Sequence, residues 1–281
     1  MTAGEVRARQ EAGRAGQASS TWRLDLAYQG TAYHGWAAQP GERTVEGTLS
    51  EALRIALREP VRLSVAGRTD AGVHAWAQVA SFVTGSDLHP HRLRHSLNAL
   101  LPPDIAVQAI TQVPSTFVAR EAESRTYRYT LWLSPVKPVR DRPYVWHVRG
   151  PVDAAALSAA AALLPGTRDF AALTPSAHLY HSCVRRVLEA WWSPGESDEL
   201  GPATGASAGP LDVRDSSGLV FTITAGSFLH NMVRVAVGSM VDVAQGRLSL
   251  KEFGAALESC DRRRAGRTAP ARGLALVAVR Y

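Results

Sequence analysis

The sequence contains little cysteine: Cys183 and Cys260 are the only two among 281 residues. Two cysteines cannot build a disulfide framework, and this pair lacks the spacing of a metal site. No apolar run reaches the ~18 residues that a membrane-spanning helix needs. Residues 1–20 also lack the apolar centre of a signal peptide. These absences argue against a disulfide-rich secreted domain and a membrane protein, and we expect a cytoplasmic location.

Lysine is also nearly absent, since Lys137 and Lys251 are the only lysines among the 31 basic residues. The formal net charge is +6, and arginine supplies almost all of the positive charge. The planar guanidinium group binds phosphates in a fork and stacks on bases. We therefore expect a polyanionic partner rather than a membrane.

The remaining composition is ordinary for a globular protein, with 46% hydrophobic and 20% charged residues. The length suffices for one large domain or two modest ones. Residues 1–20 are polar and rich in small side chains, which predicts a disordered tail. Residues 193–217 are rich in Gly, Pro, Ser, Ala and Asp, which predicts a flexible insertion. We expect an N-terminal half at 21–113 and a C-terminal half at 114–281.

Hydrophobic periodicity predicts strands and helices along both halves. In the first half we expect strands at 22–28, 61–67, 78–83 and 105–110, and helices at 44–58 and 90–100. In the second half we expect strands at 125–133, 187–192, 219–224 and 274–281, and helices at 154–164, 228–244 and from about 250. This order resembles the ferredoxin-like β-α-β-β-α-β unit. The predicted class is α+β, with two such halves joined in a mixed, mostly antiparallel sheet with flanking helices.

A short glycine-bounded loop at residues 66–75 (AGRTDAGVHA) separates two predicted strands. In an extended chain, period-two alternation places Arg68 and Asp70 on the same face. A guanidinium beside a carboxylate lowers the pKa of the carboxyl by ~1–3 units, which suits a nucleophilic or acid–base aspartate. For an isolated Arg-x-Asp pair, a hairpin with a surface salt bridge is the better interpretation. The whole block, however, resembles the catalytic loop of the tRNA pseudouridine synthase A (TruA) family, whose signature reads Gly-Arg-Thr-Asp-Ala-Gly-Val-His.

Tyr127 and Tyr129 share one face of a predicted strand with Arg125. An aromatic residue beside arginines can stack a base and hold its phosphate, although tyrosine is also common in ordinary strands. The order Arg-x-Tyr-Arg-Tyr resembles a second motif of the same family. That resemblance implies that Tyr127 contacts the target uracil.

Two further segments carry the resemblance. Residues 117–120 (FVAR) are similar to a substrate-contacting Phe-x-Ala-Arg segment, which implies substrate contacts for Phe117 and Arg120. Arg234 interrupts an apolar helical pattern, where an arginine must be paired or reach water. The matching family segment, Phe-x-x-x-Met-Val-Arg, implies that Arg234 pairs with Asp70.

The resemblance extends from about residue 22 to residue 281. Its first motif departs from the family pattern, because Gln29 replaces the usual Asp and Ala37 replaces the usual Gln. These departures lie outside the catalytic loop and concern local RNA contacts. His178 and His181 lie in a loop that aligns with a substrate-contacting family segment, although the residues there do not match it.

The resemblance implies a pseudouridine-synthase-like fold and an enzyme that isomerises uridines at tRNA positions 38, 39 and 40 in the anticodon stem-loop. Asp70 would be the nucleophile, forming an adduct at the sugar or the uracil, or would remove a sugar proton. Arg68 would hold the extruded nucleotide, since the base must leave the stem. The isomerisation needs no cofactor. The family also implies a homodimer with each tRNA spanning both subunits, and no DNA partner is expected.

Other functional classes remain as alternatives. A catalytically silent tRNA-binding protein could use the same scaffold but would not need an intact Asp70 loop. A metal-dependent RNA hydrolase would need clustered ligands. His91 and His95 lie four residues apart, but no cysteine or carboxylate completes a site, and Arg92 and Arg94 would repel a cation. We therefore expect no metal site. Within the synthase class, the alternative is that the enzyme modifies a different uridine in RNA.

Overall fold

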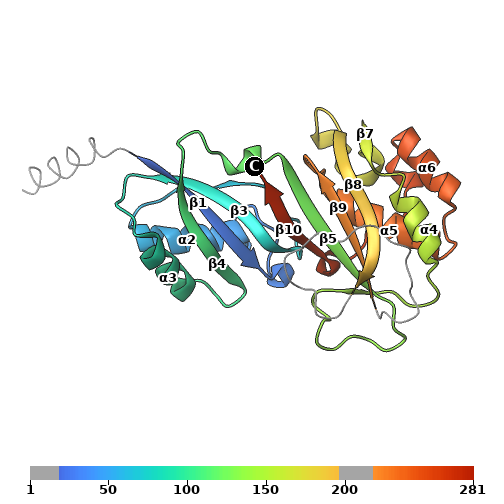
Figure 1. Ribbon diagram of the computed structural model, residues 1–281, viewed down its shortest axis with the longest axis horizontal. Helices are drawn as coiled ribbons and strands as arrows, with labels where there is room; N and C mark the ends of the chain where they lie inside the picture. Colours follow the sequence, from blue (N-terminus) through green and yellow to red (C-terminus); the bar gives the residue numbers. More distant parts are fainter. Residues whose placement is uncertain (1–18, 196–217) are drawn as a thin grey trace, which may run out of the picture.

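The computed structural model describes residues 19–195 and 218–281. The disordered tail predicted at 1–20 and the flexible insertion predicted at 193–217 lie almost wholly outside these residues. Ser20 already belongs to the first strand, and residues 193–195 belong to a later strand rather than to an insertion, because they pair with residues 218–220. Over the described residues the chain forms one ten-stranded sheet flanked by helices (Figure 1).

Most neighbouring strands are antiparallel, in the order β4-β1-β3-β10-β5-β9-β8-β7, with β2 paired to β3 and β6 paired to β5. The parallel pairs are β10 with β3 and β5 with β6. The bounds are β1 Ser20–Tyr28, β2 Ser64–Val65, β3 His74–Thr84, β4 Ile105–Val113, β5 Ser124–Trp132, β6 Trp146–His147, β7 Gly166–Asp169, β8 Val184–Gly195, β9 Gly218–Ala225 and β10 Leu274–Arg280. The predicted α+β class with a mixed, mostly antiparallel sheet is confirmed.

The C-terminal strand β10 joins the two parts of the sheet. Figure 1 shows it in red, between β3 in cyan and β5 in green. Leu276 of β10 pairs with Ala75 on one side and with Tyr127 on the other. Strand β10 therefore lies beside both the end of the 66–75 loop and strand β5, which carries Tyr127.

Helices flank the sheet at its two ends (Figure 1). Their bounds are α2 Val45–Leu57, α3 Pro90–Leu100, α4 Ala154–Ala161, α5 Met232–Ala244 and α6 Leu250–Ser259. The Thr44 side chain caps α2 by accepting a hydrogen bond from the Gly47 N–H. Leu49 and Leu53 on the inner stripe of α2 are fully buried, and each contributes ~1.5–3 kcal/mol to folding.

Several predicted elements are shorter in the structure, among them the helix predicted at 154–164, which ends at Ala161. One of these differences shapes the site. The strand predicted at 61–67 is reduced to β2, because only its two residues pair with β3. The helix predicted at 228–244 begins only at Met232. Asn231 has φ of 60°, a left-handed conformation that cannot continue a right-handed helix. Residues 227–231 therefore form a turn before α5.

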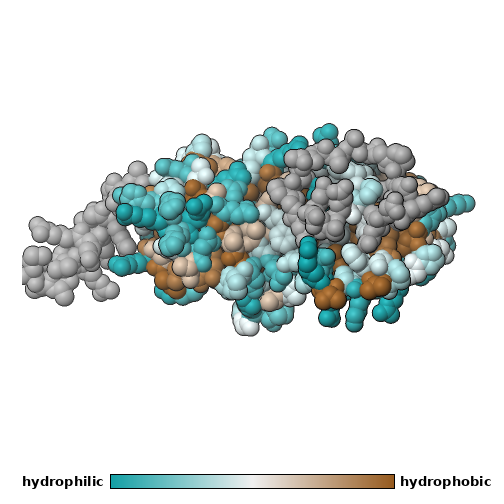
Figure 2. Space-filling model, turned by 60° about the horizontal axis from the view of Figure 1, so that its bottom comes forward, coloured by the Kyte–Doolittle hydropathy of each residue, from teal (hydrophilic) through white to brown (hydrophobic). Residues whose placement is uncertain are grey.

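Exposed apolar side chains form separate patches on the face shown in Figure 2, with polar residues between them. The large hydrophobic residues exposed on the described surface are Ile55, Val83, Leu100, Val136, Val139, Leu179, Val184, Leu188, Leu250 and Tyr281. Scattered exposure of this kind is normal, whereas a large contiguous patch marks a docking face. No described helix has the length and apolar character needed to cross a membrane.

Gly30 lets the chain after β1 pass very close to the 66–75 loop. A Cβ at Gly30 would lie 1.9 Å from the carbonyl oxygen of Val73. The Gly30 N–H also donates a hydrogen bond to His74 Nδ1 at 3.1 Å. A side chain at this position would have to push the loop away and break that bond.

We predict that Gly30→Ala destabilises the protein and moves the loop, because overpacking of a tight contact costs ~1–3 kcal/mol. Chemical unfolding would measure the loss. The control is Gly85→Ala, because a Cβ at Gly85 meets nothing within 4 Å; it should change stability by no more than ~0.5 kcal/mol. Equal stability of the two variants would contradict the prediction.

Candidate active site

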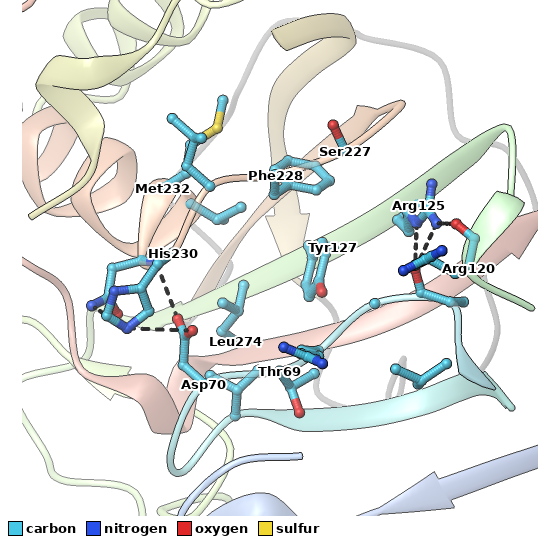
Figure 3. Close-up of a pocket in the computed structure, with 18 of the residues that line it drawn as sticks. Thr69, Asp70, Arg120, Arg125, Tyr127, Ser227, Phe228, His230, Met232 and Leu274 are labelled. Carbon is cyan, nitrogen blue, oxygen red and sulfur yellow. Dashed lines mark hydrogen bonds and ion pairs between the residues drawn. The ribbon is translucent and has the colours of Figure 1, made fainter. Parts of the chain in front are cut away.

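A cavity of about 930 Å³ opens beside the 66–75 loop and is lined by residues of that loop, of β5 and of the turn before α5. Figure 3 shows Asp70 facing His230, with Tyr127 lying between the Asp70 side and the Arg125 side of the cavity. The lining includes four of the predicted site residues: Arg68, Asp70, Arg120 and Tyr127. Phe117 is not among the lining residues and instead packs on Tyr281, with ring centroids 4.7 Å apart.

The 66–75 loop is held by the end of β1 and by the segment that follows it. The Tyr28 hydroxyl and Thr69 Oγ1 are 2.7 Å apart, and the Trp36 N–H donates to the Thr69 carbonyl at 3.0 Å. The Gly72 N–H donates to the Tyr33 carbonyl at 3.1 Å. The residues on both sides of Asp70 are therefore fixed, which orients its carboxylate.

His74 closes the loop and is a structural residue. Its Nδ1 accepts from the Gly30 N–H, so its Nε2 carries the proton and donates to the carbonyls of Pro143 (3.0 Å) and Arg272 (3.2 Å). Burial lowers the pKa of His74, with the two carbonyl contacts opposing the shift. The neutral ring is the form that the surrounding backbone requires.

Asp70 carries a half-hidden carboxylate, with 21% of its side chain exposed. Burial raises its pKa, and the charges of His230 and Arg234 and a backbone hydrogen bond from Asn231 oppose that rise. The Asn231 N–H donates to Asp70 Oδ2 at 3.3 Å, and His230 Nε2 lies 3.7 Å from Oδ1. The predicted lowering of the Asp70 pKa by Arg68 is wrong, because burial dominates and Arg68 is an exposed residue that does not pair with Asp70 within the described structure.

Arg234 does not form the predicted direct pair with Asp70. Its Nε donates to the Ala269 carbonyl at 2.8 Å, and its Nη1 donates to Asn231 Oδ1 at 2.5 Å. Asn231 in turn reaches Asp70 through its backbone N–H. Arg234 therefore supports Asp70 through Asn231 and through its charge.

Tyr127 is 7% exposed and packs edge-on against Phe228, with ring centroids 5.0 Å apart. Burial raises the pKa of Tyr127 well above its usual range, and the negative charge of Asp70 adds to the rise. Its hydroxyl is therefore protonated at neutral pH. The ring offers a flat apolar surface, and the hydroxyl offers one hydrogen bond.

Arg125 has a structural role rather than the phosphate-binding role considered above. Its guanidinium donates to the carbonyls of Ala66 (2.8 and 2.6 Å), Ala122 (2.6 Å), Gly226 (2.5 Å) and Arg120 (2.6 Å). Its donors are used by backbone acceptors, and burial lowers its pKa. Arg125 thus ties together the segments on three sides of the cavity.

His230 was missed in the sequence. It lies in the same sequence segment as Arg234, but a single histidine in a predicted helix did not indicate a contact with Asp70. The left-handed turn at Asn231 places it at the cavity wall, where Ser176 Oγ lies 2.9 Å from its Nδ1. The Tyr180 hydroxyl accepts from its backbone N–H at 2.9 Å.

The other histidines considered in the sequence lie away from the cavity lining. His178 and His181 are exposed, as are His91 and His95 on α3. Over residues 19–195 and 218–281, no group of three or more His, Cys, Asp or Glu side chains is placed to hold a metal ion.

Comparison with known proteins decides the family. A family model described as tRNA pseudouridine synthase matches residues 26–120 and 160–281. The chain belongs to this family. The resemblance predicted from the motifs is confirmed, as is the predicted class of enzyme, an isomerase.

Individual relatives are similar over nearly their whole length. The tRNA pseudouridine synthase A of Pelobacter propionicus is 40% identical over 262 residues, which cover 93% of this chain and 99% of the relative. The protein of the same name from Solidesulfovibrio magneticus is 42% identical over 270 residues, covering 92% and 90%. That from Chloroflexus aurantiacus is 39% identical over 259 residues, covering 92% and 87%.

We predict that Arg125→Lys destabilises the protein by ~2–4 kcal/mol, because a lysine cannot reproduce the guanidinium fork and hydrogen bonds to charged groups are each worth ~1.5–3 kcal/mol. Chemical unfolding monitored by circular dichroism would measure this. Arg92→Lys, at an exposed position on α3, is the control and should be neutral. A neutral Arg125→Lys would show that the carbonyls find other partners.

We predict that His74 makes the protein less stable as the pH falls. The folded-state pKa is lowered, so the stabilisation is complete above the unfolded-state pKa of about 6.5 and is lost as pH drops below it. Unfolding free energies between pH 7.5 and 5.5 should fall less steeply for His74→Gln, by up to ~1.4 kcal/mol per pH unit. His91→Gln is the exposed control and should keep the wild-type slope. An unchanged slope in His74→Gln would contradict the prediction.

Proposed function

We propose that the enzyme isomerises uridine to pseudouridine at positions 38, 39 and 40 of the tRNA anticodon stem-loop, with Asp70 as nucleophile. The N1–C1′ bond breaks, the uracil turns, and C5 bonds to C1′ while the C5 proton is lost and N1 gains one. The observation that carries this proposal is the fixed Asp70 carboxylate facing into the 930 Å³ cavity.

The cavity suits a single flipped nucleotide. Its volume falls in the ~300–1,000 Å³ range of small-molecule sites. A uridine in a stem must leave the stack to reach Asp70, and unstacking costs a few kcal/mol. A protein that takes in one base at a time needs a stacking surface and cationic side chains at the rim, and the aromatic rings and exposed arginines of the lining support such a role.

The remaining predicted residues have different roles in this proposal. Tyr127 and Phe228 present rings on which the uracil stacks, and the neutral Tyr127 hydroxyl contacts the base. Arg68 and Arg120 are exposed members of the lining, free to follow the RNA backbone. Arg234 supports Asp70 through Asn231. Phe117 packs on Tyr281 rather than contacting the base.

The family resemblance also supports a homodimer in which each tRNA touches both subunits, and a cytoplasmic enzyme without a cofactor. Asp70 reacts in its charged form whether it attacks the sugar, attacks the uracil or removes a sugar proton. A charged carboxylate in a partly buried site is costly unless neighbouring donors hold it, and the His230 and Asn231 contacts supply that support.

We predict that Asp70→Asn abolishes pseudouridine formation and leaves tRNA affinity nearly unchanged, because affinity rests on arginine–phosphate contacts. Pseudouridine would be mapped in tRNA after incubation, and affinity measured by filter binding. Asp87→Asn, an exposed carboxylate outside the cavity, is the control and should be fully active. Turnover by Asp70→Asn would remove Asp70 as nucleophile, and an inactive wild type that still binds tRNA would indicate a silent tRNA-binding protein.

A further inference from the structure

His230 occupies a defined place among three other side chains. Its Nε2 lies 3.7 Å from Asp70 Oδ1 and 3.2 Å from Asn231 Nδ2, and its Nδ1 lies 2.9 Å from Ser176 Oγ. The backbone on either side is also held, since the His230 N–H donates to the Tyr180 hydroxyl and the Asn231 N–H donates to Asp70. Ser176 therefore orients the ring through Nδ1, while Nε2 lies close to both the Asn231 amide and the Asp70 carboxylate.

We propose that His230, oriented by Ser176, is a positioning residue that keeps the Asp70 carboxylate charged and directed into the cavity. This inference rests on the proposed function, in which Asp70 reacts as a carboxylate. His230 does not touch the substrate in this proposal; it acts through Asp70.

The geometry favours His230 over Arg234 for this role. The Arg234 guanidinium is engaged by Ala269 and by the Asn231 side chain, so its influence on Asp70 is indirect. The left-handed conformation of Asn231 turns the chain so that the His230 ring and the Asn231 N–H both face Asp70. Asparagine adopts this conformation more readily than most residues.

Several charged or titratable groups share this environment. A smaller hollow beside the cavity is lined by His34, Glu42 and Arg68 together with Asp70 and His230. His34 and Glu42 are 2.9 Å apart and form a pair of their own.

Two more groups face Asp70 from the sheet and from α5. Tyr127 of β5 is neutral, because its pKa is raised, and Arg234 of α5 supplies a constant positive charge. Burial raises the pKa of Asp70, and of the groups that oppose this rise His230 has the largest effect. Its removal therefore raises the pKa of Asp70 further and leaves more of the carboxyl protonated in weakly acidic solution.

The test is the pH profile of kcat/KM on a tRNA transcript between pH 5 and 9. His230→Gln should move the acid limb upward by about one pH unit. Relative to its own plateau, this variant should lose about tenfold in activity on the acid side, because one pKa unit is a tenfold change. Ser176→Ala should shift the limb in the same direction by less, since the ring loses its orienting contact.

Two further variants separate charge from shape. His230→Lys restores a positive charge and should move the acid limb back toward that of the wild type. His95→Gln, an exposed histidine on α3, should keep the wild-type profile. Circular dichroism and tRNA affinity check folding; if His230→Gln fails to fold, Ser176→Ala and His230→Lys carry the test.

The outcomes distinguish this inference from the proposed function. An active wild type with no limb shift in His230→Gln, or with the same loss at every pH, would overturn the role of His230 alone. A His230→Lys variant no better than His230→Gln on the acid side would overturn it as well. A wild type without pseudouridine formation, or an active Asp70→Asn variant, would instead overturn the proposed function.

Discussion

The buried guanidinium of Arg125 is the interaction on which the shape of the cavity depends. It is a cation with 7% exposure whose hydrogen bonds in the described structure all go to backbone carbonyls. Removing such a group from water is costly, and the cost is offset only when its donors are satisfied. The acceptors lie at the start of the 66–75 loop, just before β5 and just before the turn that carries His230. One side chain therefore fixes the distances between the walls that any bound nucleotide would meet.

The same enclosure creates a conflict at Asp70. Shielding from water strengthens every electrostatic interaction in the cavity, but it also favours the neutral carboxyl. The structure places three compensating groups on one short stretch of chain: the His230 ring, the Asn231 N–H and the Arg234 guanidinium. The left-handed residue just before α5 turns the chain so that groups of the preceding turn and Arg234 in the first turn of α5 all act on Asp70. The backbone conformation of that turn therefore determines which charged groups and hydrogen-bond donors lie close to Asp70.

The sequence predicted the features that are set locally. The inner stripe of α2 follows from the spacing of Leu49 and Leu53, and the place of Asp70 between two strands follows from flanking alternation and glycine. The sequence did not predict the contacts between segments that are distant along the chain. Alternation correctly placed Arg125 and Tyr127 on one face of the strand. It could not show that the Arg125 guanidinium donates its hydrogen bonds to backbone carbonyls. Nor could it show β10 entering between β3 and β5, because strand pairing over such separations leaves no periodic trace in the sequence.

The motif around Asp70 is specific because most of its positions meet a different neighbour. Thr69 contacts the end of β1, and His74 bridges the Gly30 N–H and two distant carbonyls. The departure at Gln29 fits this arrangement, since its side chain donates to the Tyr144 hydroxyl at 2.7 Å, and Tyr144 packs on His74 with ring centroids 5.1 Å apart. The altered residue thus supports the back of the loop, away from the Asp70 carboxylate. A sequence change within the first motif is therefore compatible with an unchanged geometry at Asp70, because the Gln29 side chain contacts Tyr144 and not the Asp70 carboxylate.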